Sequence, residues 1–96
     1  MNTHAALPLK GIKVIDFKNM LMAPYATQIL GDMGADVIKV EAPVGDPVRL
    51  IGPARNQGMG AIFINCNRSK RSIVLNVKHP DGHKTLMDLV ATADVL

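Results

Sequence analysis

The chain has 96 residues, a length that fits one domain at most. Its 48% hydrophobic and 20% charged residues are typical of a globular protein and exclude a disordered tail. Three aromatic residues and a net charge of +3 are too few for a nucleic-acid-binding surface. No apolar run reaches the ~20 residues of a membrane span. The single cysteine, Cys66, excludes an internal disulfide, favours a packing role and indicates a reducing, cytoplasmic location.

The first part of the chain predicts a strand–helix–strand unit. Residues 12–17 are rich in β-branched and other apolar residues and predict a buried strand, and residues 36–40 predict a second one. A helix is expected between them at 24–33, ended by Gly34. Its signal is a set of apolar residues at helical spacing: Tyr25, Ile29, Leu30 and Met33. Such a unit forms a right-handed parallel crossover.

The second part begins with a long connection. Glycine and proline residues crowd 42–60 and predict a loop, and loops of that length are usually functional or disordered. Residues 61–65 are apolar and of uncertain type, and 67–71 predict a basic turn. Three further elements are then expected: a strand at 72–77, a helix at 80–93 and the beginning of a fourth strand at 94–96. The prediction is an α/β fold, a Rossmann-like parallel sheet with flanking helices. Two helices scarcely cover four strands, so we expect a part of a larger protein.

The residues alone indicate a ligand edge without catalytic machinery. Glu41, at the end of the second strand, is in the position of a ribose-binding carboxylate. The loop at 18–24 lacks the glycines that a dinucleotide pyrophosphate requires, so a solvated strand end is the preferred interpretation of Glu41. The cations Arg68, Lys70 and Arg71 are able to neutralise phosphates, although a solvated turn is the commoner role of such a cluster. No catalytic residue and no metal ligand set is assigned.

Motifs from Pro8 onward follow the order of a known family. They are Pro8–Phe17, Ala23–Glu41, Pro43, Gly45-Asp46, Arg49, Asn67–Ile73, Pro80-Asp81-Gly82 and Ala93–Leu96. Together they resemble the family III CoA-transferases, or CaiB/BaiF family, which includes formyl-CoA transferase, carnitine CoA-transferase and the α-methylacyl-CoA racemases. The resemblance implies that residues 1–96 are the incomplete N-terminal part of the large domain of a cytoplasmic, interlocked homodimer.

The resemblance also implies an activity, the transfer of CoA between carboxylic acids. In such enzymes an aspartate attacks the acyl-CoA thioester and then carries CoA as an aspartyl thioester. That aspartate falls beyond Leu96, and Asp16 does not match its motif, so the 96-residue segment alone is expected to be inactive. Two alternatives remain open. One is the racemase or epimerase branch, in which an acid–base pair exchanges the α proton. The other is a truncated, non-catalytic module for CoA binding or dimerisation.

Contacts to CoA are implied for two segments. The positions that line the CoA site of formyl-CoA transferase correspond here to Asn19, Met20, Leu21, Leu75, Asn76, Val77 and Lys78. Arg71 is added because of its charge and proximity. Leu21 and Ala42 replace a glutamine and an arginine of formyl-CoA transferase, which argues against formyl or oxalyl specificity. The expected partners are acyl-CoA and carboxylic acids as substrates, with no tightly bound cofactor, metal, nucleic acid or membrane.

Overall fold

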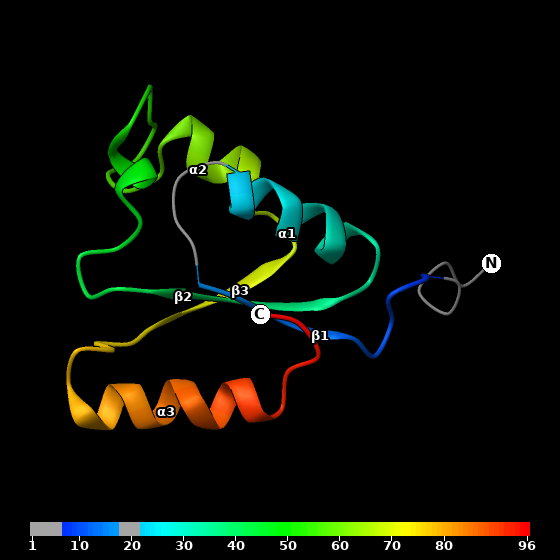
Figure 1. The fold of residues 1–96 in the computed structure, drawn as a ribbon. Helices are drawn as coiled ribbons and strands as arrows, with labels where there is room; N and C mark the ends of the chain where they lie inside the picture. The colour runs from blue at the N-terminus through cyan, green and yellow to red at the C-terminus, as the bar shows by residue number, and fades with distance from the viewer. Residues whose placement is uncertain (1–6, 18–21) are drawn as a thin grey trace.

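The computed structural model describes residues 7–17 and 22–96. Three parallel strands form one sheet in the order β1-β2-β3. The elements are, in chain order, β1 (Lys13–Asp16), α1 (Met22–Asp32), β2 (Asp36–Glu41), the 3-10 helix η2 (Pro47–Leu50), α2 (Ala61–Cys66), β3 (Lys70–Val74) and α3 (Pro80–Ala91). Helices α1 and α2 lie on one face of the sheet and α3 lies on the other (Figure 1). The predicted α/β fold with a parallel sheet and flanking helices is confirmed.

The third strand begins earlier than the sequence predicts. Lys70 and Arg71, assigned to a basic turn, already pair with β2, and the strand ends at Val74. The turn is therefore confined to residues before Lys70, and Ser69 takes the positive φ of 62° that reverses the chain there. Beyond the strand, the Leu75 amide still donates to the Glu41 carbonyl at 2.9 Å. The apolar residues 61–65, whose type the sequence left open, belong to helix α2. Helix α3 ends at Ala91, two residues before the predicted end at residue 93.

The two faces of the sheet have different chemistry. The face toward α3 is apolar, with Ile15, Ile38 and Val40 packed against residues that include Ile73, Leu75, Leu86, Leu89 and Ala93. The opposite face has an apolar cluster of Val14, Ala35 and Val37. Because side chains alternate along a strand, this face also receives Asp16, Lys39 and Glu41, each no more than 2% exposed. Among the described residues of the sheet, the buried charges therefore lie on this face, toward the carboxyl ends of β1 and β2.

Helix α1 turns a polar side toward these charges. Its buried residues are Pro24 and Gln28, and the Thr27 hydroxyl donates to the Asp16 carboxylate at 2.9 Å. Among the apolar residues that predicted the helix, only Leu30 packs against the core. The others point outward, with 54%, 41% and 44% of their surface exposed: Tyr25, Ile29 and Met33. The helical spacing was correct, but it marks the outer side of α1, because buried charges require polar neighbours.

The segment predicted to begin a fourth strand lies beside β1. Val95 forms a parallel bridge with Val14, on the edge of β1 away from β2. The Ile15 amide donates to the Val95 carbonyl at 2.9 Å. The chain thus leaves β3 at one end of the sheet and returns next to β1. This reversal is a topological switch point, and ligands of open α/β sheets bind at the carboxyl ends of the strands there.

Candidate functional site

Two pockets lie at the carboxyl edge of the sheet. The smaller, of about 150 Å³, is lined by Phe17, Val40, Glu41, Ala42, Leu75 and Val77. The larger, of about 530 Å³, lies between α1 and the edge of β1 that Val95 joins. It is lined by Val14, Ile15, Asp16, Phe17, Ala23, Ala26, Thr27, Leu30, Val95 and Leu96. Phe17, which directly follows β1, lines both pockets and is 40% exposed. The residues at the end of β1 therefore shape both hollows of the edge.

The predicted binding residues after β3 reach this edge. Leu75 and Val77 line the smaller pocket. Between them Asn76 shapes the turn into α3, because its side-chain oxygen accepts from the Lys78 amide at 3.3 Å and its carbonyl accepts from the His79 amide at 3.0 Å. Lys78 is exposed beside the turn. The structure thus brings these four residues together next to a pocket. Asn19, Met20 and Leu21 lie outside the described residues.

Arg71 lies elsewhere. Its guanidinium forms a bidentate ion pair with Asp36, with Nη2 2.6 Å from Oδ2 and Nε 3.2 Å from Oδ1. Asp36 is the first residue of β2, so this pair lies toward the amino ends of the strands. Lys78 comes after the carboxyl end of β3. The structure therefore does not bring Arg71 and Lys78 together at one site.

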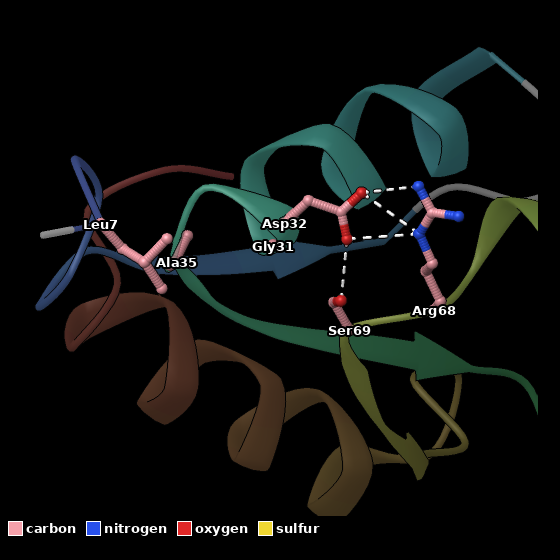
Figure 2. A pocket seen from close by; sticks show the side chains of 7 residues that line it. Leu7, Gly31, Asp32, Ala35, Arg68 and Ser69 are labelled. Carbon is pink, nitrogen blue, oxygen red and sulfur yellow. Dashed lines mark hydrogen bonds and ion pairs between the residues drawn. The ribbon is translucent and has the colours of Figure 1, made fainter. Parts of the chain in front are cut away.

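The pair of Arg68 and Asp32 also lies at the amino edge. A third pocket, of about 640 Å³, is lined there by Leu7, Gly31, Asp32, Gly34, Ala35, Arg68 and Ser69. Figure 2 shows the Asp32 carboxylate pointing toward both Arg68 and Ser69. Arg68 Nη2 donates to Asp32 Oδ2 at 2.9 Å, and the Ser69 hydroxyl donates to Oδ1 at 2.8 Å. The hydrogen bond from Arg68 lowers the pKa of Asp32 below its ordinary value. These contacts fasten the turn before β3 to the end of α1.

A chain of four buried charges connects the strands near the carboxyl edge. Lys70 Nζ lies 2.8 Å from Asp16 Oδ2, and Lys39 Nζ lies 3.0 Å from Asp46 Oδ2 and 3.9 Å from Asp16 Oδ2. None of the four side chains is more than 2% exposed. Burial lowers the pKa of the Lys70 ammonium, and the hydrogen bond to Asp16 opposes that effect. The cations of the predicted basic cluster therefore diverge, because Arg68, Lys70 and Arg71 each pair with a different aspartate.

Glu41 holds the long connection after β2 in place. Its carboxylate accepts from Arg49 Nε and Nη2, both at 2.8 Å, from the Asp46 amide at 2.9 Å, and from the Ser72 hydroxyl. The Arg49 hydrogen bond is the main reason why the pKa of Glu41 falls to about 2. The same guanidinium lies 3.7 Å from the centre of the Phe63 ring. The interpretation of Glu41 as a solvated strand end was wrong, because its side chain is only 2% exposed.

Neither of these networks was predicted from the sequence. A signal was present, because Lys39 and Glu41 alternate with Ile38 and Val40 along one strand, and Asp16 follows Val14 and Ile15 in another. Alternation places such charges on the covered face of the sheet, where they need partners. Among the described residues, no three His, Cys, Asp or Glu side chains form a group able to hold a metal ion. No helix in residues 7–17 and 22–96 is long and apolar enough to cross a membrane.

The fold and the two pockets place the chain in the class of open α/β proteins whose ligand site is at the carboxyl edge, beside the switch point. Residues 9–96 match CoA-transferase family III, and the chain belongs to that family. The resemblance noted in the sequence is therefore confirmed.

Relatives and solved structures agree with this assignment. The chain is 42% identical to the succinyl-CoA–L-malate CoA-transferase beta subunit of Chloroflexus aurantiacus, over 98% of this chain and 24% of the relative. It is 44% identical to the human succinyl-CoA:glutarate CoA-transferase, over 92% of this chain and 20% of the relative. A crystal structure of a CaiB/BaiF family protein from Brucella suis superposes with a TM-score of 0.85 at 44% identity, over 92% of this chain and 25% of that one. The chain thus spans between a fifth and a quarter of the length of these proteins.

Proposed function

We propose that this chain is part of an enzyme that moves CoA from succinyl-CoA to a second carboxylic acid. The observation that carries the proposal is the identity of 42–44% to two transferases whose names give succinyl-CoA as the donor. Their acceptors are named as L-malate and glutarate, so a C4 or C5 dicarboxylate is the acceptor class that we propose here.

The residues at the carboxyl edge would hold the CoA part of the substrate. Leu75 and Val77 offer apolar contacts within the smaller pocket, and the exposed ammonium of Lys78 next to them suits a phosphate group of CoA. Asn76 would fix the turn that presents Lys78. The remaining proposed contacts come from the segment of Asn19, Met20 and Leu21. Arg71 would reach a phosphate only if its pair with Asp36 opened, so Lys78 is the cation that we place on the phosphates.

The proposed reaction proceeds through an aspartyl intermediate. A carboxylate of the enzyme attacks the thioester carbonyl, the C–S bond breaks and CoA leaves as a thiolate, which leaves a mixed anhydride. The thiolate then attacks the aspartyl carbonyl of the anhydride, releases the donor acid and forms an aspartyl-CoA thioester. The acceptor carboxylate takes CoA by the reverse steps. Asp16 is unsuited to this attack because it is 2% exposed and bound by Lys70 and Thr27. The nucleophile is therefore proposed to lie outside residues 1–96.

The test is an exchange assay on the complete polypeptide encoded with this segment. Succinyl-CoA is incubated with glutarate or L-malate, and the CoA esters are identified by mass spectrometry. Glutaryl-CoA or malyl-CoA is the expected product, together with an enzyme-bound CoA adduct on an aspartate. Loss of stereochemistry at the α carbon of an α-methylacyl-CoA, without exchange between acids, would instead identify the racemase branch. A stop codon directly after Leu96 would favour the non-catalytic module.

We also propose that the complete protein is a homodimer. Two relatives from Chloroflexus aurantiacus are named as the beta and alpha subunits of one transferase, so the family includes assemblies with two kinds of chain. Native mass spectrometry of the purified enzyme distinguishes the two arrangements. One subunit mass and its double are expected, and a second polypeptide that copurifies in equal amount would contradict the proposal.

A further inference from the structure

The ion pair between Asp16 and Lys70 joins strands that are not neighbours. The sheet order is β1-β2-β3, so the side chain of Lys70 on β3 extends across β2 to reach Asp16 at the end of β1. Both side chains are at most 2% exposed. Burying an ion pair carries a large desolvation cost, and apolar residues of similar volume often serve stability equally well. Stability alone is therefore a weak reason for a buried pair at this place.

Lys70 contacts Asp16, which lines the larger pocket, and Pro24, which follows the lining residue Ala23. Its ammonium donates to Asp16 Oδ2 at 2.8 Å, to the Pro24 carbonyl at 2.9 Å and to Asn67 Oδ1 at 2.7 Å. All three ammonium protons thus have acceptors. Asp16 is the last residue of β1, and Pro24 lies in the first turn of α1. The Thr27 hydroxyl of α1 donates to the same oxygen of Asp16, at 2.9 Å.

These contacts fix the two elements that shape the carboxyl edge. Asp16 is followed directly by Phe17, which lines both pockets. The first turns of α1 contribute Ala23 and Thr27 to the larger pocket. If the ammonium were absent, the end of β1 and the start of α1 would lose the donor that they share. The pocket walls would then no longer be held at a fixed separation.

We propose that Lys70 is a positioning residue for the acyl-CoA site. It acts through Asp16 and the Pro24 carbonyl, which hold the end of β1 and the first turn of α1 around the pockets. Lys70 itself does not touch the substrate. The inference rests on the proposed function, because it assigns acyl-CoA to the carboxyl edge.

The test uses the double variant Asp16→Asn/Lys70→Met of the complete protein. Both replacements are close in volume to the original residues, and the change removes one negative and one positive charge. Lys39 keeps its partner Asp46, and the Thr27 hydroxyl keeps acceptors at the Ala23 and Pro24 carbonyls. The control is Asp32→Asn/Arg68→Met, which makes the same change of charge but removes an exposed ion pair at the amino edge.

The expected result separates affinity from stability. Affinity for CoA, measured by isothermal titration calorimetry well below the melting temperature, should fall about tenfold in the Asp16→Asn/Lys70→Met variant. The KM for acyl-CoA should rise by a similar factor, while the KM for the acceptor acid and the melting temperature stay close to those of the wild type. The control should bind CoA as the wild type does. Unchanged CoA affinity in the double variant, or an equal loss in the control, overturns the inference.

A second variant tests the inference if Asp16→Asn/Lys70→Met does not fold. Thr27→Val keeps every charge and removes the hydroxyl that donates to Asp16, together with its contacts to the Ala23 and Pro24 carbonyls within α1. It should weaken CoA binding about threefold, and unchanged affinity would overturn the inference equally well. A wild-type protein that neither binds CoA nor transfers it would instead refute the proposed function, and the inference with it. An active wild type with unaffected variants would refute the inference alone.

Discussion

The substitution Arg49→Met should destabilise the protein by roughly 3 kcal/mol at pH 7, and most of that difference should vanish in acid. Arg49 is the main reason why the pKa of Glu41 falls from 4.5 to about 2. At about 1.4 kcal/mol for each pKa unit, this corresponds to roughly 3 kcal/mol of stabilisation of the ionised carboxylate. The value agrees with the 3–5 kcal/mol typical of removing one partner from a buried pair.

The pH dependence follows from the direction of the shift. The pKa of Glu41 is lower in the folded protein than in the unfolded chain, so the stabilisation is fully present above about pH 4.5. It is lost as the pH falls toward 2, because Glu41 then becomes protonated in the folded protein as well. The Arg49→Met variant lacks the part of this contribution that Arg49 supplies, which is the largest, at every pH. The difference between wild type and variant should therefore shrink through this window.

The assay is urea denaturation of the complete protein, followed by circular dichroism at pH 7, 5 and 3.5. Arg55→Met is a suitable control, since Arg55 is an exposed arginine of the same connection. Its free energy of unfolding should stay within about 0.5 kcal/mol of the wild type. A loss below 1 kcal/mol in Arg49→Met at pH 7 would refute the reasoning. So would a loss of equal size at pH 7 and pH 3.5.

Three other outcomes are expected. Lys78→Ala in the complete enzyme should raise the KM for acyl-CoA about tenfold with a smaller effect on kcat, since a charge-assisted phosphate contact contributes roughly 1.5–3 kcal/mol. Steady-state kinetics at two salt concentrations measure this effect. An unchanged KM with an unchanged salt dependence would contradict the prediction. Gly60→Ala should lower the melting temperature and reduce the free energy of unfolding by roughly 2 kcal/mol or more, because a Cβ there would lie 2.6 Å from the Ile51 carbonyl oxygen. Scanning calorimetry measures the change, and an unchanged melting temperature would exclude the clash. The isolated 96-residue segment should show no CoA exchange by mass spectrometry, and detectable exchange would place a nucleophile within it.

The elements that the sequence predicted well depend on local patterns. The strand near residues 13–16 and the strand near 36–41 are short apolar runs, and Gly34 ends α1 with the positive φ of 104° that glycine adopts readily. The start of β3 was misplaced because Lys70 and Arg71 have the local character of a turn. Their place in a strand depends on Asp16 and Asp36, which belong to other strands. That information is not present in any local window of the sequence.

The same distinction applies to the candidate site. The family resemblance placed Leu75 and Val77, and the structure puts both in a pocket wall. The partnership of Glu41 with Arg49 could not be inferred, because the two residues are joined by an irregular connection whose path no periodicity describes. The charges that alternate with apolar residues toward the end of β2 did carry usable information. They indicated that one face of the sheet is charged under its helix, although not which residues pair there.

The bridge between Val14 and Val95 has a consequence for how the chain is made. The pairing of β1 with β2 closes over a short connection and is available early in synthesis. The other edge of β1 has no pairing partner until Val95 has emerged from the ribosome. An open strand edge is a template for association with other chains, and on β3 the exposed charge of Arg71 opposes this. The centre of β1 is formed by the apolar residues Val14 and Ile15. The nascent chain is therefore most exposed to misassociation at this first strand. The exposure ends when α3 has been synthesised and the chain has returned across the sheet to the outer edge of β1.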